Sequence, residues 1–113
     1  MRLKPFLFNN PEETELAKLL DTGYYGINIV FCKWVKELCD EYKLNFDNIY
    51  KRFNHAYNQG YANTLPNVQR PVLKPVLGPI GGDCIVPNGK ILAKFIPGNP
   101  VSNLINFWEK RFQ

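Results

Sequence analysis

The sequence predicts a mostly α-helical protein, and two observations carry the prediction. Apolar side chains recur at three- and four-residue steps over residues 11–59, which is the spacing of one helix face, and no proline interrupts residues 12–65. Asparagine, alone or followed by proline, precedes each apolar stretch, as it does at the start of many helices. We therefore expect a long N-terminal helix packed with shorter helices, plus an extended Pro/Gly-rich loop.

Composition indicates a single globular domain over residues 1–113. The chain is 45% hydrophobic and 21% charged, which is typical of globular and not of disordered proteins. Its apolar stretches are too short to span a membrane, and Asn9 and Asn10 interrupt any signal-peptide region. The net charge of +4 comes from scattered residues, whereas nucleic-acid binders usually carry a denser basic stripe. We expect a soluble, cytoplasmic protein that binds neither nucleic acid nor a membrane.

The first helix is expected over residues 11–43. Asn10 suits the position before a helix, Pro11 suits its first residue, and the carboxylates of Glu12 and Glu13 complement the helix dipole. Such a helix is about 50 Å long, which is longer than a compact domain of this size is wide. It needs something to lie against, and a homodimer formed through this helix is the simple answer.

Two glycines, Gly23 and Gly26, lie inside this first helix, where each costs about 1 kcal/mol relative to alanine. One interpretation is the close approach of another backbone, and the other is a local kink at Gly23. Because residues three apart share one helix face, the spacing favours close packing.

The remaining elements are predicted from the asparagines and prolines. Asn45 is expected to cap a helix over residues 46–59 whose apolar stripe comprises Phe46, Ile49, Tyr50, Phe53 and Tyr57. Five prolines within residues 66–87 exclude helix and central strand, so residues 60–87 are expected to form an extended loop. Asn88 is expected to cap a helix over residues 89–96, and Asn99-Pro100 to open a helix over residues 100–112.

The cysteines predict neither a disulfide nor a metal site. Cys32 and Cys39 are seven residues apart in the first helix, about 10 Å along its axis, which is too far for a disulfide. We expect both to be small buried apolar residues. No cysteine pair has metal-ligand spacing, and the single His55 lies far from all three cysteines in sequence.

One segment, residues 78–88, has the composition of a chemical site: GPIGGDCIVPN. Its glycines bring backbone amides close to any ligand, and Cys84 lies just before an expected helix, whose dipole favours a thiolate. The alternative is a tight turn with an incidental thiol. The residues alone leave these two interpretations evenly balanced.

Four short segments together resemble the central helical domain of the UDP-glucose and GDP-mannose dehydrogenase family. Residues 81–84, GGDC, resemble that family's Gly-Gly-Ser-Cys or Gly-Gly-His-Cys motif, and residues 15–19, ELAKL, resemble the Glu-Leu-x-Lys-Leu opening of its central helix. Asn28-Ile29 resembles an Asn-Ile pair further along that helix, and residues 70–78 resemble the Arg…Leu-x-Pro…Gly run before the cysteine. Order and spacing agree from about residue 12 to residue 95.

The resemblance implies a helical fold like the C-terminal domain of 6-phosphogluconate dehydrogenase, and roles for particular residues. In that family the cysteine attacks an aldehyde intermediate to form a thioester, and a lysine stabilises the oxyanion-like states. These residues match Cys84 and Lys18. Arg70 matches a family arginine that reaches substrate bound mainly by the neighbouring subunit. Lys74 matches a substrate-binding lysine of the family, one residue out of register. The implied substrate site also includes Asn28, Gly81 and Gly82.

The departures from the family pattern concern the same site. Thr22 stands where the family commonly has an asparagine that helps to hold a catalytic water, and Asn88 stands where it commonly has an aspartate. Asp83, in place of serine or histidine, should disfavour a thiolate by charge repulsion. No Gly-x-Gly-x-x-Gly sequence occurs, so we expect no cofactor on this chain. NAD would enter only if a partner chain supplied the Rossmann domain.

Three hypotheses remain open. The first is a stand-alone central domain that dimerises through its long helix and binds a nucleotide sugar without oxidising it alone. The second is one subunit of a split NAD-dependent UDP-sugar or GDP-mannose dehydrogenase, whose NAD-binding part is a separate chain. The third is an interaction protein that retains only the scaffold.

Overall fold

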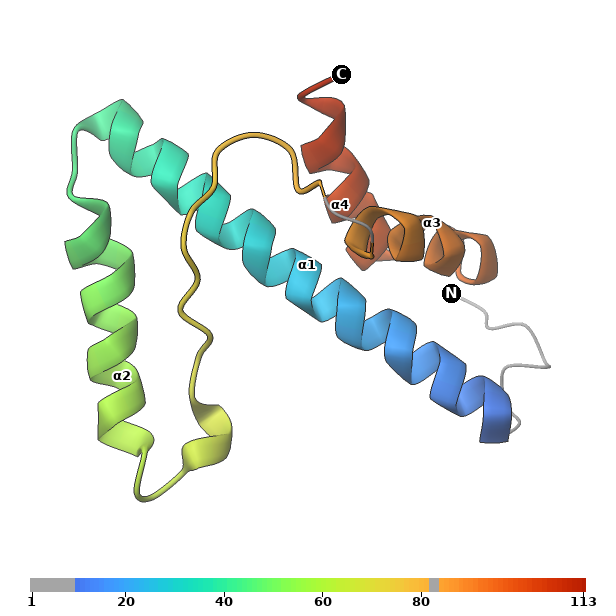
Figure 1. The fold of residues 1–113 in the computed structure, drawn as a ribbon, viewed down its shortest axis with the longest axis horizontal. Coiled ribbons are helices and arrows are strands. Elements are labelled where there is room, and N and C mark those ends of the chain that lie inside the picture. Colours follow the sequence, from blue (N-terminus) through green and yellow to red (C-terminus); the bar gives the residue numbers. More distant parts are fainter. Residues whose placement is uncertain (1–9, 82–83) are drawn as a thin grey trace. The chain divides into compact units, whose positions relative to one another are not determined.

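The computed structural model describes residues 10–81 and 84–113, and these residues are mostly helical. Four α-helices succeed one another in chain order: α1 (Asn10–Tyr42), α2 (Phe53–Tyr61), α3 (Ile85–Phe95) and α4 (Pro100–Lys110) (Figure 1). A π-helical turn, Asp47–Arg52, leads into α2, and a short 3-10 turn, Pro66–Val68, comes after it. The described residues include no strand. The predicted mostly-α class is therefore confirmed.

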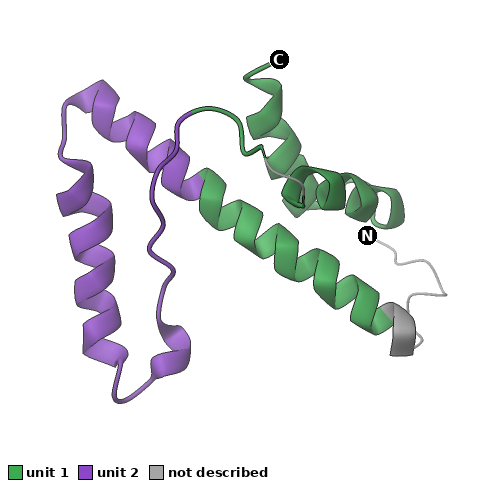
Figure 2. Cartoon of the chain, in the orientation of Figure 1, with its two compact units in different colours: residues 1–30, 78–113 green, residues 31–77 purple. Residues whose placement is uncertain are grey.

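The chain forms two compact units (Figure 2). Unit 1 contains residues 1–30 and 78–113, and unit 2 contains residues 31–77. Residues of α1 up to Val30 thus belong to unit 1, and those from Phe31 onward belong to unit 2. Each unit has its own core.

The core of unit 1 is built where α1 meets α3 and α4. Leu19 of α1 packs with Leu92 and Ile96, and partly buried Leu16, Phe95 and Val101 surround them. Ile105 and Trp108 of α4 are each 2% exposed. Burial of these aliphatic and aromatic side chains is what holds the three helices together.

The glycines of α1 lie at close contacts in this core. A Cβ atom added to Gly23 would lie 2.6 Å from Val101 Cγ1, and one added to Gly26 would lie 2.7 Å from Ile85 Cγ2 and 3.1 Å from Ile105 Cδ1. Close packing at the shared glycine face is therefore confirmed. The neighbours that approach most closely are branched side chains of α3 and α4 and not another backbone.

Asn99 caps α4 as expected. Its Oδ1 accepts a hydrogen bond from Ser102 N at 2.8 Å, and its Nδ2 donates to the Ile96 carbonyl and to Ser102 Oγ, both at 2.9 Å. Pro100 fills the first helical position, where a backbone N–H would have no partner. Because Asn99 is 4% exposed, this cap is part of the core.

The core of unit 2 joins the end of α1 to the π-helical turn. Its buried members are Cys32, Val35, Cys39, Phe46 and Tyr50, and Val72 and Leu73 pack against them. Phe46 stacks on Tyr50 with ring centroids 4.9 Å apart. Cys32 and Cys39 are each 1% exposed and form no disulfide, which confirms their expected role as buried apolar residues.

Residues 69–76 come after α2 as an extended strap that buried polar groups hold in place. Tyr50 Oη accepts a hydrogen bond from Leu73 N at 3.2 Å, and Cys32 Sγ donates to the Leu73 carbonyl at 3.6 Å. Lys33, only 4% exposed, donates from Nζ to the carbonyl of Val76. Side chains thus satisfy the backbone groups of Leu73 and the carbonyl of Val76 in place of a neighbouring strand.

Three details of the expected elements are wrong. The extended loop expected over residues 60–87 contains the 3-10 turn Pro66–Val68 and gives way to α3 at Ile85. Ile49 and Phe53 are 46% and 61% exposed and do not join the apolar stripe, because residues 47–52 form a π-helical turn, which has more residues per turn than the α-helix that the pattern assumed. Asn88 does not cap α3, which begins at Ile85 and contains Pro87 in its first turn. Proline is tolerated there because the first N–H groups of a helix have no partner within it.

Candidate functional site

Cys84 lies immediately before α3, and its side chain is exposed. Its carbonyl accepts a hydrogen bond from Asn88 N at 3.0 Å, the first bond of that helix. Gly81 is exposed with φ +64, a backbone conformation that favours glycine. Gly82 and Asp83, the other residues of the GGDC segment, lie outside the described residues. The thiol therefore lies at an accessible helix start.

Thr22 and Asn88 connect α1 to α3. Asn88 Nδ2 lies 3.5 Å from Thr22 Oγ1, the long end of the hydrogen-bond range, and 66 residues separate the two in sequence. Thr22 Oγ1 itself donates to the Lys18 carbonyl at 3.0 Å. One turn of α1 thus joins Lys18 to Thr22, and one turn of α3 joins Cys84 to Asn88.

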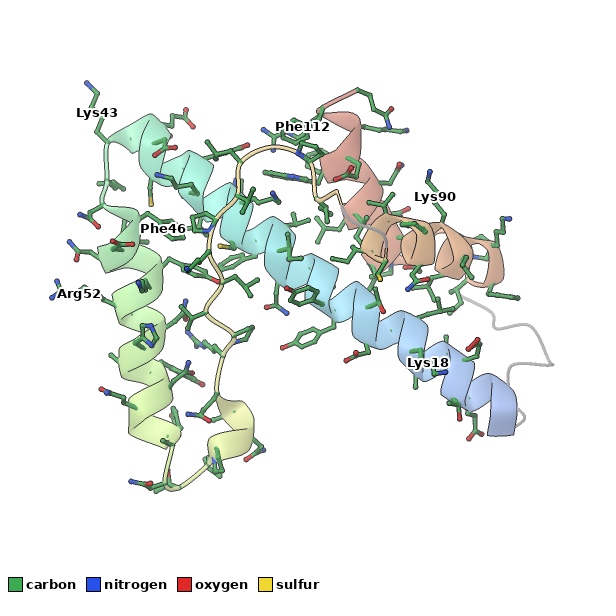
Figure 3. All side chains as sticks on the ribbon, viewed as in Figure 1. Lys18, Lys43, Phe46, Arg52, Lys90 and Phe112 are labelled. Atoms are coloured by element: carbon green, nitrogen blue, oxygen red, sulfur yellow. The ribbon has the colours of Figure 1, made fainter. Side chains whose placement is uncertain are left out.

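The two helices run in opposite directions in unit 1 (Figure 1). Gly26 approaches Ile85 at the start of α3, whereas Leu19 packs against Leu92 nearer its end. Lys18 and Cys84 therefore lie on opposite sides of the Thr22–Asn88 contact, each about 6 Å from it along its helix. The exposed side chain of Lys18 projects from α1 (Figure 3).

This set of side chains offers a nucleophile and a cation, with polar groups between them. Cys84 supplies a thiol and Lys18 an ammonium group, while Thr22 and Asn88 supply a hydroxyl and an amide. Neither a threonine hydroxyl nor an asparagine amide acts as a general base at neutral pH. The arrangement suits binding and covalent capture better than hydrolysis.

The remaining predicted residues are placed in two different regions. Asn28 lies on α1 in unit 1 and uses its Nδ2 within the helix, donating to the Tyr24 carbonyl at 2.9 Å. Arg70 and Lys74 are exposed residues of the strap in unit 2. The contacts of unit 1 thus join Thr22 to Asn88 and leave Lys18 and Cys84 on opposite sides of that pair, while the strap carries the other two cations.

A groove between α3 and α4 is absent from the sequence-based expectations. Its volume is about 190 Å³. Lys90 and Glu109 supply its charged groups, and the other lining residues are Val86, Gly89, Ala93, Ser102, Asn103, Ile105, Asn106 and Gln113. Its two walls come from different helices, so no single sequence pattern marks it.

Metal ligands and membrane-spanning helices were also sought in the structure. Within residues 10–81 and 84–113, no group of three or more His, Cys, Asp or Glu side chains is arranged to hold a metal ion. In that same part of the chain, no helix is long and apolar enough to cross a membrane.

Comparison with known proteins adds no identification. No protein-family model matches the chain, and neither a curated protein nor a solved structure does so.

Proposed function

We propose that this chain is a homologue of the central domain of nucleotide-sugar dehydrogenases, which dimerises and binds a nucleotide sugar without oxidising it alone. The observation that carries the proposal is the 3.5 Å contact between Thr22 and Asn88. The resemblance assigns these two positions, together with Lys18 and Cys84, to one pocket. A pocket of that kind requires the α1 and α3 segments to meet at these positions.

The chemistry of the pair favours binding over turnover. A thiol can add to an aldehyde, but hydrolysis of a thioester needs an activated water. Thr22 and Asn88 occupy the positions of the family's water-holding asparagine and aspartate, and they lack a carboxylate. The cation of Lys18 and the thiol of Cys84 then serve as contacts for the sugar end of the ligand. Arg70, as the resemblance implies, reaches a ligand that is bound mainly by another copy of the chain.

The proposal is tested by calorimetric titration of the purified chain with UDP-glucose, UDP-N-acetylhexosamines and GDP-mannose. We expect one of them to bind, and Lys18→Ala to weaken its binding about tenfold, the value of one charge-assisted hydrogen bond. Lys51→Ala, which removes an exposed lysine of the π-helical turn in unit 2, should leave the affinity unchanged.

Two results would contradict the proposal. If no nucleotide sugar binds to the folded protein, the interaction-protein hypothesis replaces it. If the purified chain reduces NAD with a nucleotide sugar at a steady rate, the claim that it does not oxidise alone is wrong. A Cys84→Ser variant should bind the ligand like the parent and lose only its reaction with sugar aldehydes.

A further inference from the structure

Arg70 is exposed, yet its backbone is held from both sides by one side chain. Asn58 Oδ1 accepts a hydrogen bond from Arg70 N at 2.6 Å, and Asn58 Nδ2 donates to the Arg70 carbonyl at 2.8 Å. Gln69 Nε2 returns a hydrogen bond to the Asn58 carbonyl at 3.2 Å. This part of the strap is therefore fixed to α2 at the residue that bears the charge.

The guanidinium group of Arg70 is held as well. Its Cζ lies 3.6 Å from the centroid of the Tyr57 ring, a close cation–π stack, and its Nη1 lies 3.5 Å from Asn54 Oδ1. Asn54, Tyr57 and Asn58 all belong to α2, where three- and four-residue spacing places them on neighbouring positions of one face.

Holding an exposed arginine in this way costs side-chain entropy, and a stacked guanidinium group still presents N–H groups along its edge. When a ligand binds, that entropy has already been lost, so more of the interaction energy appears as affinity. The planar fork of N–H donors matches the oxygen atoms of a phosphate group.

The local charge also favours an anion. Residues 48–82 contain no aspartate or glutamate, and their charged residues are Lys51, Arg52, Arg70 and Lys74. No carboxylate within this segment competes for the guanidinium group, and the positive potential around it attracts anions.

We propose that Asn54, Tyr57 and Asn58 are positioning residues that preorganise Arg70 as a receptor for the phosphate group of a ligand. The identity of that ligand as a nucleotide sugar rests on the proposed function. The receptor itself rests only on the contacts and charges of unit 2.

The test is calorimetry on the 113-residue chain at low salt, with pyrophosphate, UDP and UDP-glucose as probes. We expect Arg70→Ala to weaken pyrophosphate and UDP binding about tenfold or more. Tyr57→Leu and Asn58→Ala should each weaken it about threefold to tenfold, whereas Tyr57→Phe keeps the ring and should keep the affinity.

Arg52→Ala is the matched control. Arg52 is also an exposed arginine of unit 2 that donates to an asparagine, from Nη1 to Asn48 Oδ1 at 3.0 Å, and its side chain projects away from the helix (Figure 3). The substitution should change the affinity by less than about twofold, because Arg52 lacks the pair of hydrogen bonds by which Asn58 holds the backbone of Arg70.

A second readout separates positioning from a purely structural role. In the parent and in the folded Tyr57→Phe variant, the Nε–Hε NMR signal of Arg70 should be sharp and dispersed. In the folded Tyr57→Leu variant, the same signal should move to the averaged position of a freely rotating arginine side chain. A structural role alone would lower the melting temperature of Tyr57→Leu without changing this signal or the affinity.

The binding results distinguish a failure of the phosphate-receptor inference from a failure of the proposed function. The inference is wrong if pyrophosphate and UDP do not bind, if Arg52→Ala weakens binding as much as Arg70→Ala, or if Tyr57→Leu and Asn58→Ala bind like the parent. If UDP-glucose binds equally well to the parent and to Arg70→Ala, the inference fails and the proposed function stands. If pyrophosphate and UDP bind through Arg70 but no nucleotide sugar binds, the receptor stands and the proposed function fails.

Discussion

Gly26 and Gly60 show how the same residue type has opposite consequences in two helices. In the described structure, a Cβ atom at Gly26 would meet side chains of Ile85 and Ile105, whereas a Cβ atom at Gly60 would meet nothing within 4 Å. Both glycines lie in α-helices, where alanine is intrinsically preferred by about 1 kcal/mol. The outcome of a substitution therefore depends on the space around each site.

We expect Gly26→Ala to lower the free energy of unfolding and Gly60→Ala to raise it. Overpacking at Gly26 costs about 1–3 kcal/mol, which exceeds the gain in helix propensity, while Gly60→Ala has only that gain, at most about 1 kcal/mol. Urea denaturation of the two variants and the parent measures both changes. Equal stabilisation by both substitutions would show that α1 and its neighbours adjust without strain.

Asn88 and Asn99 show that a local sequence pattern predicts some helix caps correctly and others wrongly. The sequence predicts a helix cap at both. Asn99 forms one, because proline comes directly after it and its partner Ser102 is only three residues away. Asn88 lies inside α3, and its side chain contacts Thr22 of another helix. A contact across 66 residues leaves no mark in the local sequence.

At the scale of elements, the buried hydroxyl group of Tyr50 helps to hold the strap in place. Burial raises the pKa of Tyr50 above its usual value of 10.0, and burial likewise raises the pKa of the Cys32 thiol above 9.0. The neutral Tyr50 hydroxyl accepts the hydrogen bond from Leu73 N. Both groups are thus held in their protonated forms in the folded protein.

We expect the free energy of unfolding to fall as the pH rises through about 9 to 11. A raised pKa in the folded state means that the unfolded chain releases its protons first, so the contribution of these groups is complete below their usual pKa values and is lost above them. Urea denaturation between about pH 7 and pH 10.5 measures this decline.

Tyr50→Phe provides the specific comparison. It should cost about 1 kcal/mol at neutral pH, because Leu73 N loses its acceptor, and it should flatten the alkaline decline. Tyr25→Phe, at a tyrosine that is 52% exposed, should retain the parent's pH dependence. A parent whose stability is constant or rising between about pH 9 and pH 10.5 would contradict the assignment.

For the molecule as a whole, the exposed apolar residues of α1 bear on self-association. Leu20 and Tyr24 in unit 1 are 45% and 60% exposed, and Phe31 and Trp34 in unit 2 are 52% and 49% exposed. Their separations of four, seven and three residues match the spacing of a coiled-coil seam. A second copy of the chain lying along α1 would remove these side chains from water.

We therefore predict a dimer in solution that a charge on this seam disrupts. Tyr24→Glu and Phe31→Glu should each shift the sedimentation coefficient toward that of a monomer, because a carboxylate buried at an interface without a partner costs several kcal/mol. Phe107→Glu changes an α4 residue that is 63% exposed and should leave the dimer intact. A parent that sediments as a monomer at high concentration would remove the dimer from the proposed function.

The helix content, the cap at Asn99 and the burial of Cys32 and Cys39 could be predicted from the sequence. Each depends on interactions within a few residues or on a periodic apolar pattern, and both can be read from neighbouring residues in the sequence. The π-helical turn and the hydrogen bonds of Asn58 to Arg70 could not, and for the contact of Thr22 with Asn88 only the family resemblance, and no local pattern, gave a signal. The two contacts join segments that are separated in the chain, where the geometry of the neighbours decides which polar groups meet.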